Sequence, residues 1–260
     1  MIVVRGAGDL ASGIIHKLHN SGFKVVALET KNPLAIRRKV SFSEAVYDSS
    51  VVVDGVSAKL VSSVKEAMEN EFVSILIDPN MDYIQELRPD CIIDSIMAKR
   101  NVGTKITDAR IVIGVGPGFT AGIDCHAVVE TKRGHDLGRI YYEGTALQNT
   151  GIPGTIKGYD SERVLHSPEN GMIKNHFEIG DIVKQGQPVF TVIEEVIAPF
   201  TGVLRGIIRN GTIVKRGMKV ADLDPRIEEV RNCYRISEKA RCIAGSVLEA
   251  VMHLRGRDEQ

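Results

Sequence analysis

"IVVRGAGDLASGIIHKLHNSGFKVVALET", residues 2–30, decides the fold because two buried strands flank a glycine turn and an amphipathic helix. The apolar run Ile2–Val4 is typical of a buried parallel strand. Leu10, Ile14 and Leu18 recur every four residues, which predicts a helix with one buried face. Gly22 stands where a helix end needs a left-handed residue, and the second strand, "KVVALE", follows. The stretch therefore predicts the first strand, helix and strand of a Rossmann-like sheet.

The turn between the first strand and the helix fits the spacing GxGxxG/A. Gly6 permits the tight turn, Gly8 lets a phosphate approach the backbone, and Ala11 permits close packing. Glu29 follows about twenty residues on, where an acid can accept hydrogen bonds from a ribose. Asp9 beside the turn would repel a pyrophosphate unless it points away. The pattern favours a nucleotide-type ligand, and the alternative is a Rossmann-like half whose loop binds nothing.

Three later apolar runs, "FVSILID", "DCIIDSIMA" and "ARIVIGVG", predict further strands of a mostly parallel sheet. In such sheets ligands bind beyond the carboxyl ends of the strands. Lys99, Arg100 and Asn101 follow the second of these runs, so we expect them near the glycine turn. Anion binding is favoured over a merely solvated loop.

The segment "GVGPGFTAGIDCHAVVETKRGHDLG", residues 114–138, is rich in glycine and reactive side chains. Glycines around a proline predict a sharp turn whose N–H groups could bind an anion. An aromatic ring there would cover a flat ligand or fill the core, and the basic loop downstream would complete a polar pocket. The ligand-binding candidates of this segment are Gly116, Gly118, Phe119, Thr120, Arg133 and His135.

Cys125, His126 and His135 are the candidates for catalysis in the same segment, and they also invite a metal interpretation. Neighbouring residues of a strand point to opposite faces, and no second close ligand pair exists, so we expect no metal site. Nothing in the sequence shows how a nucleophilic Cys125 would be activated. No catalytic role is assigned.

The third part of the chain is duplicated. "GMIKNHFEIGDIVKQGQPVFTV" (171–192) aligns with "GVLRGIIRNGTIVKRGMKVADL" (202–223) at an offset of 31. Short β-branched runs between glycines predict two interlocked β-rich copies. The pattern resembles the biotinyl/lipoyl carrier fold, a barrel-sandwich. The carrier lysine is missing from the joint "VIEEVIAPF", so the resemblance implies a structural module.

A helix is predicted over the tail "ISEKARCIAGSVLEAVMHL", with Ser237 as its N-cap. The predicted organisation is α/β: a Rossmann-like domain with a mostly parallel sheet, then a β-rich region with the duplicated module, then the C-terminal helix. The predicted bounds are 1–118 for the Rossmann-like domain, 119–166 for a β-rich middle segment, 167–226 for the duplicated module and 227–260 for the helical tail.

The composition narrows the function classes. Lysine plus arginine (33) balances aspartate plus glutamate (33), which argues against a general nucleic-acid binder. No apolar run reaches membrane-spanning length, and the N-terminus lacks the design of a signal peptide. Four scattered cysteines fit a reduced, cytoplasmic protein. The oligomeric state stays open, a homo-oligomer included.

Long motifs of the chain, "RGAGDLASGIIHKLHNSGF", "AKRNVGT", "GPGFTAGIDCHAVVETKRGHDLGR" and "EKARCIAGSVLEA", resemble the YqeB-type family of the selenium-dependent molybdenum hydroxylase system. The resemblance implies a maturation role with a hydroxylase apoenzyme as partner and selenium, sulfur or a molybdopterin-type cofactor as cargo. "GAGD" also looks like the "GAGH" of XdhC-type chaperones, with Asp9 in place of the histidine.

Three function classes remain open on the sequence. The first is an accessory protein that binds a small phosphate-bearing cofactor of nucleotide or pterin type. The second is an NAD(P)-dependent oxidoreductase that uses the turn from Gly6 to Ala11, and the third is a non-catalytic docking protein.

Overall fold

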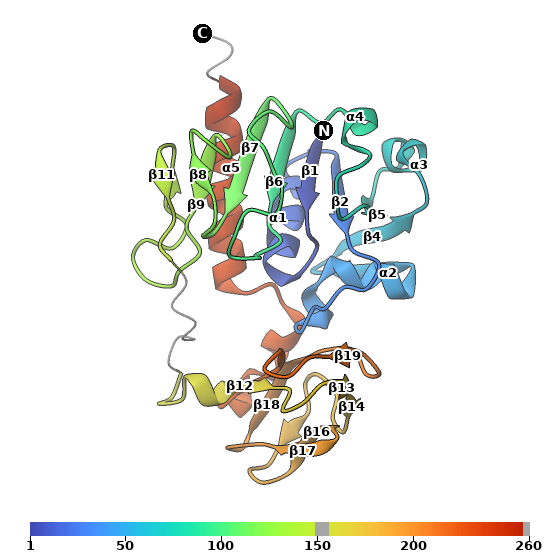
Figure 1. Ribbon diagram of the computed structural model, residues 1–260, viewed down its shortest axis with the longest axis vertical. Helices are drawn as coiled ribbons and strands as arrows, with labels where there is room; N and C mark the ends of the chain where they lie inside the picture. Colours follow the sequence, from blue (N-terminus) through green and yellow to red (C-terminus); the bar gives the residue numbers. More distant parts are fainter. Residues whose placement is uncertain (149–155, 257–260) are drawn as a thin grey trace. The chain divides into compact units, whose positions relative to one another are not determined.

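The computed structural model describes residues 1–148 and 156–256, and the chain forms two compact units, each with its own hydrophobic core (Figure 1). The first unit, here the sheet unit, consists of Met1–Pro33, Ser41–Thr150 and Ile236–Gln260. The second, here the repeat unit, consists of Leu34–Val40 and Gly151–Arg235. Of the regions anticipated as separate, residues 119–148 of the middle segment and the tail helix belong to the sheet unit, whereas residues 156–166 and 227–235 belong to the repeat unit.

Within the described residues, the sheet unit holds one sheet of nine strands (Figure 1). Its core strands are parallel, and the edge strands β10 and β3 are antiparallel to their neighbours. The mostly parallel sheet predicted from the apolar runs is confirmed. In spatial order the strands are β10 (Ile140–Tyr141), β9 (Ala127–Val129), β7 (Ile111–Val115), β6 (Cys91–Asp94), β1 (Ile2–Arg5), β2 (Val25–Glu29), β5 (Val73–Ile77), β4 (Val56–Val61) and β3 (Ser50–Val53). A small ribbon joins β8 (Thr120–Ala121) to β11 (Gly144–Thr145).

The strand order reverses at β1, because the chain continues to β2 on one side and β6 lies on the other. This reversal creates a topological switch point between the carboxyl ends of β1 and β6, the usual ligand position in such sheets. The glycine turn follows β1 directly, so the fold places it at the switch point.

Helix α1 (Asp9–Asn20) begins at the glycine turn and packs against the C-terminal helix α5 (Glu238–Gly256). Gly13 makes this contact close, because a Cβ atom there would lie 2.8 Å from the Cβ of Ala240. Ser237 accepts a hydrogen bond from the Ala240 N–H and caps α5 as predicted. Gly22, with φ of +84°, ends α1. The shorter helices are α2 (Ala45–Asp48), α3 (Val64–Glu69) and α4 (Ile84–Leu87), and a 3-10 turn spans Phe42–Glu44.

The repeat unit is built from the two sequence copies, and each copy pairs with the other. Gly171 pairs with Val214, and the equivalent Gly202 pairs with Val183. The first strand of each copy therefore pairs with the short Ile-Val strand of the other copy. The strands are β12 (Val164–His166), β13 (Gly171–Met172), β14 (Lys174–Asn175), β15 (Ile182–Val183), β16 (Pro188–Val192), β17 (Glu194–Ile197), β18 (Gly202–Ile207), β19 (Ile213–Val214) and β20 (Lys219–Asp224), with 3-10 turns at Arg38–Val40, Ser161–Arg163 and Ile227–Tyr234.

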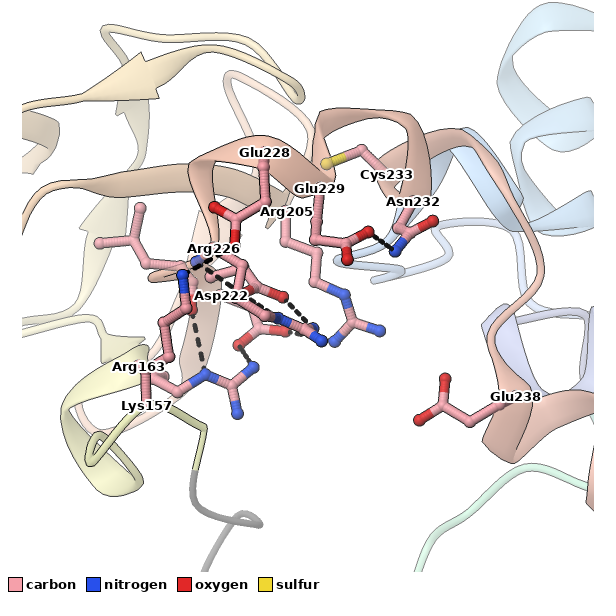
Figure 2. A network of polar contacts seen from close by, with 12 residues as sticks. Lys157, Arg163, Arg205, Asp222, Arg226, Glu228, Glu229, Asn232, Cys233 and Glu238 are labelled. Atoms are coloured by element: carbon pink, nitrogen blue, oxygen red, sulfur yellow. Dashed lines mark hydrogen bonds and ion pairs between the residues drawn. The ribbon is translucent and has the colours of Figure 1, made fainter.

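Buried charges form ion pairs with β20 in the repeat unit (Figure 2). Asp222 lies 3.8 Å from the Arg163 guanidinium and 3.2 Å from that of Arg205. Asp224 accepts two charged hydrogen bonds from Arg226, the shorter at 2.6 Å. Because buried charges are stable only when paired, this network fixes how the 3-10 turns meet the strand.

Candidate functional site

Four loops meet at the carboxyl edge of the sheet, and glycines mark their contacts. A Cβ atom on Gly6 would lie 3.2 Å from the Ser95 carbonyl oxygen, so the turn after β1 abuts the loop after β6. One on Gly118 would lie 2.5 Å from the Arg100 Cα, so the loop after β7 abuts the same segment. Gly116 lies in the same way beside Thr131, which follows β9. The structure thus brings together the loops "GAGD", "AKRN", "GPGF" and "TKRGH".

Acids at the ends of the parallel strands hold these loops in place. Glu29, the last residue of β2, accepts hydrogen bonds from the N–H groups of Ala7 (2.9 Å) and Thr30 (2.7 Å). Its carboxylate therefore turns back onto the glycine turn. The N–H of Ala7 is occupied, and Glu29 has a structural partner in the position where a ribose was expected.

Glu130 follows β9 and is fully buried, yet it is completely satisfied by backbone donors. The N–H groups of Thr131, Lys132 and Leu147 each donate to it at 2.7 Å. This carboxylate organises the basic loop. Asp78, which follows β5, plays the same role by accepting from the N–H groups of Asp82 and Tyr83.

Arg5, the last residue of β1, is buried near the switch point and makes several hydrogen bonds there. Its guanidinium donates to Asp94 at 3.2 Å and to the Thr104 hydroxyl at 2.9 Å. It also donates to the carbonyl oxygens of Pro79 and Val102, both at 3.0 Å. One side chain therefore joins the loops after β5 and β6. Charge-assisted bonds of this kind are roughly twice as strong as neutral ones.

Three cations of the same loops have no partner among the described residues. The side chains of Lys99, Arg100 and Lys132 are exposed and form no ion pair or hydrogen bond with the part of the chain that the structure describes. His135 is exposed in the same loop as Lys132. Arg133 differs, since it pairs with Glu238 at 2.8 Å. The acids that hold these loops are engaged, so the charge they offer to a ligand is positive.

Open space lies above the glycine turn. Apart from the chain neighbours of Gly8, no atom of the described residues lies within 4 Å of the place where a Cβ atom on Gly8 would be, and Gly8 is the N-cap of α1. A helix N-terminus attracts anions through its N–H groups and its dipole. Asp9 is the first residue of this helix, and Ala11 is buried beneath the turn as close packing requires.

Several of the predicted ligand-binding residues contact other residues of the protein. Phe119 is buried with its ring on Gly114, and Thr120 lies in the β8 ribbon with its N–H bound to Asp124. Asn101 accepts hydrogen bonds from the N–H groups of Gly103 and Thr104, and its amide donates to the Thr104 carbonyl oxygen and to Asp124. These residues shape the loops that carry Lys99 and Arg100.

Cys125 is fully buried, and His126 next to it is half-buried. Burial raises the pKa of Cys125 to about 11, so only about one thiol in ten thousand is ionised at neutral pH. The Nδ1 atom of His126 accepts a hydrogen bond from the Val112 N–H, near the start of β7. Within residues 1–148 and 156–256, no three histidine, cysteine or acidic side chains gather as metal ligands.

Sequence reasoning missed Arg5, Asp78, Asp94 and Glu130. Their signal was a charged residue at the end of a buried apolar run, a position where a parallel strand passes into the loops of the ligand edge.

The fold and the edge define the class: an α/β unit with a glycine turn at its switch point, joined in sequence to a duplicated β-rich unit. The YqeB-type resemblance is confirmed by comparison. The chain is 45% identical over 258 residues to the uncharacterized protein YqeB of Escherichia coli strain K12, across 98% of this chain and 48% of that protein. The chain thus spans about half the length of the curated relative it matches. No family model matches.

Solved structures are only distantly similar. An aspartoacylase family protein from Mesorhizobium loti is 13% identical, covers 85% of this chain and 83% of its own, and has a TM-score of 0.29. The ectoine utilization protein EutE from Ruegeria pomeroyi is 10% identical, with 85% of each chain covered and a TM-score of 0.27. Scores this low carry no argument about function. Among the described residues, none of the helices combines the length and apolarity needed to cross a membrane.

Proposed function

We propose that the sheet unit binds a small phosphate-bearing cofactor of nucleotide or pterin type at its carboxyl edge. The observation that supports this proposal is that the acids of the edge are hydrogen-bonded, whereas two of its cations are not. Strand-end acids such as Glu29 and Glu130 are held by backbone N–H groups, while Lys99 and Arg100 have no partner among the described residues. The open N-terminus of α1 beside them adds a second anion-binding element.

Apolar side chains beside the cations suit the flat part of such a cofactor. Ile96 and Val102 flank the "AKRN" loop and are partly exposed, although both are large and aliphatic. Ligand sites in proteins commonly combine apolar contacts with a few placed polar groups. The edge therefore fits a heterocycle that carries a phosphate better than it fits free phosphate.

We further propose that the chain is an accessory protein in the maturation of a molybdenum hydroxylase, with the hydroxylase apoenzyme as its partner. This step rests on the motifs shared with the YqeB-type family, and the cofactor would be of molybdopterin type. The NAD(P)-dependent oxidoreductase fits less well, because Glu29 occupies the Ala7 N–H that a dinucleotide pyrophosphate would use.

For the repeat unit, we propose a barrel-sandwich module without a carrier role. The interlocked pairing of its two copies supports the fold, and the turn between β16 and β17 carries Ile193 where a carrier would present lysine.

The experiment is isothermal calorimetry of the full chain with a pterin phosphate, with NADP and with inorganic phosphate. We expect the pterin phosphate to bind most tightly and to raise the unfolding temperature, since a ligand of the native state stabilises it. Tightest binding of NADP would favour the oxidoreductase. The absence of binding by all three would overturn the proposal.

A further inference from the structure

Strand β3 ends the nine-stranded sheet on one side and pairs with β4 alone. The Leu60 N–H donates to the Ser49 carbonyl oxygen at 2.9 Å, which fixes the alternation of backbone hydrogen bonds along this pair. Because bonded positions alternate between two antiparallel strands, the N–H and C=O groups of Ser50 and Val52 point away from β4. No hydrogen bond joins these outward groups to the part of the chain that the structure describes. The outer backbone of β3 is therefore open to another strand.

The side chains of β3 do not protect this edge. Edge strands commonly carry lysine, proline or a bulge, which oppose pairing with another chain. β3 reads Ser-Val-Val-Val, without charge or proline, and it pairs with β4 in regular register. Asp54, which follows the strand, is paired with Arg241 at 2.6 Å and so adds no unpaired charge. At the opposite end of the sheet, β10 has only 2 residues, so β3 offers the longer edge for pairing.

The two faces of β3 differ in burial. Val53 is buried, and Val51 on the same face is half-buried. Val52 lies on the other face, opposite Ser57 of β4, and is 63% exposed. β-branched side chains in strands are stabilised by packing against neighbours in the adjacent strand. A further strand beside β3 would give Val51 and Val52 such neighbours.

A second β3 fits this edge. In an antiparallel two-fold pair, Ser50 of one copy would lie opposite Val52 of the other, and Val51 would meet its counterpart at the axis. This register uses the outward N–H and C=O groups of both copies and stays within the strand. Because the strand carries no charge, the contact brings no like charges together. No charged side chain of β3 would select a foreign strand, so an identical copy is favoured.

We propose that β3 pairs with β3 of a second copy, so that the two nine-stranded sheets join into one continuous sheet of a dimer. The N–H and C=O groups of Ser50 and Val52 in each copy bond to those of the other. The proposal is independent of the ligand, because it uses the side of the sheet and not the carboxyl ends of its strands.

The test is sedimentation equilibrium of the full chain over a range of concentrations, in which we expect a monomer–dimer equilibrium. Val52→Lys should weaken association about tenfold or more, because it places like charges about 7–8 Å apart across the two-fold axis. Ser57→Lys is the matched control and should associate normally, since Ser57 is exposed on the same face but one strand further from the edge. Thermal unfolding should show that both variants remain folded, because both positions are exposed.

Amide hydrogen exchange locates the contact. The Val52 amide should exchange fast in dilute samples and slowly once the dimer forms, because it then gains a hydrogen bond. The Val51 amide, which faces β4, should be slow at both concentrations. A monomer at every concentration, or a dimer that Val52→Lys leaves unchanged, would overturn the proposal. Fast exchange of the Val52 amide within the dimer would overturn it as well, because the two copies would then meet elsewhere.

Discussion

Glu29 shows how one side chain changes the chemistry of the glycine turn. The turn matches a dinucleotide fingerprint in spacing, and an acid at the end of β2 completes it. In the folded chain this acid accepts a hydrogen bond from the Ala7 N–H. One donor of the turn is therefore occupied, whereas the space beside Gly8 is open. The nearby positive charge comes from Lys99 and Arg100 in the loop after β6.

At the residue scale, Lys99→Ala and Arg100→Ala should each weaken binding of the phosphate-bearing ligand. A hydrogen bond to a charged group contributes about 1.5–3 kcal/mol, or about 10- to 150-fold in affinity. Calorimetry measures the loss. Lys65→Ala, which removes an exposed lysine paired with Glu69 on α3, is the control and should change nothing. Equal affinity of all three variants would contradict the assignment of the cationic loop.

Two glycines of the edge should respond differently to substitution. Gly8→Val should abolish ligand binding while the protein stays folded, because the space at Gly8 is open and its φ of −67° suits any residue. Gly118→Ala should destabilise the fold, because its φ is +109° and the new atom would lie 2.5 Å from the Arg100 Cα. Thermal unfolding and calorimetry separate the two. Normal binding by folded Gly8→Val would place the ligand elsewhere.

At the scale of the elements, close backbone approach joins the ends of the sequence in one unit. Helices α1 and α5 are more than two hundred residues apart along the chain and yet pack side by side (Figure 1). The contact depends on the absence of a side chain at Gly13, since small residues at a crossing let two helices approach. A substitution there tests the helix pair directly.

Gly13→Ala should lower the free energy of unfolding by about 1–3 kcal/mol, the usual cost of inserting a methyl group into a packed contact. Gly245→Ala in α5 is the matched control. Apart from the backbone of α5 itself, no atom of the described residues lies within 4 Å of a Cβ atom at that position, so the higher helix propensity of alanine should stabilise by up to about 1 kcal/mol. Urea unfolding of both variants measures the difference, and equal effects would contradict the close packing.

In the repeat unit, the buried network gives a pH dependence. Burial acts to raise the pKa of Asp224, but hydrogen bonds from Arg226 outweigh it and hold the pKa below the ordinary 3.8. A carboxyl whose pKa is lowered by folding stabilises the protein above its unfolded pKa, and this stabilisation is lost as the pH falls through the folded value.

We therefore expect the repeat unit to lose stability as the pH falls below about 3.8, the unfolded value. Asp224→Asn should lower stability at neutral pH and flatten its dependence on acid. The exposed Glu195→Gln should leave the profile unchanged. Urea midpoints from pH 6 to pH 3 measure both, and an unchanged slope in Asp224→Asn would show that this carboxyl does not control the acid limit.

At the scale of the whole molecule, the proposed ligand edge lies in one of the two compact units. The loops after β1, β6 and β7 belong to the sheet unit, and the duplicated strands belong to the repeat unit. We therefore expect a ligand at this edge to protect the sheet unit alone.

Hydrogen exchange should therefore differ between the sheet unit and the repeat unit when the ligand is bound. The phosphate-bearing ligand should slow exchange at residues 6–10, 95–101 and 116–118, because binding raises the cost of local opening. Residues 171–223 should exchange at the same rate with and without it. Protection confined to the repeat unit would overturn the assignment of the ligand to the sheet edge.

The sequence by itself determined the local structure and the order of the elements. The period of apolar residues predicted the strands and helices, and the spacing of the glycines predicted the turn, because both depend on neighbours along the chain. The offset of 31 predicted two matching copies in the repeat unit. The sequence predicted Lys99, Arg100 and Gly8 at the ligand edge, because parallel strands end at one edge of their sheet.

Only the tertiary structure decided which charges are available at that edge. Glu29, Arg5 and Glu130 each have at least one partner from a segment distant in sequence, and no local pattern shows that these charges are satisfied. Likewise, it is in the folded chain that burial raises the pKa of Cys125 and that His126 accepts a hydrogen bond from the β7 backbone. Which side chains face a ligand depends on pairing across the fold, and that pairing exists only once the strands have assembled.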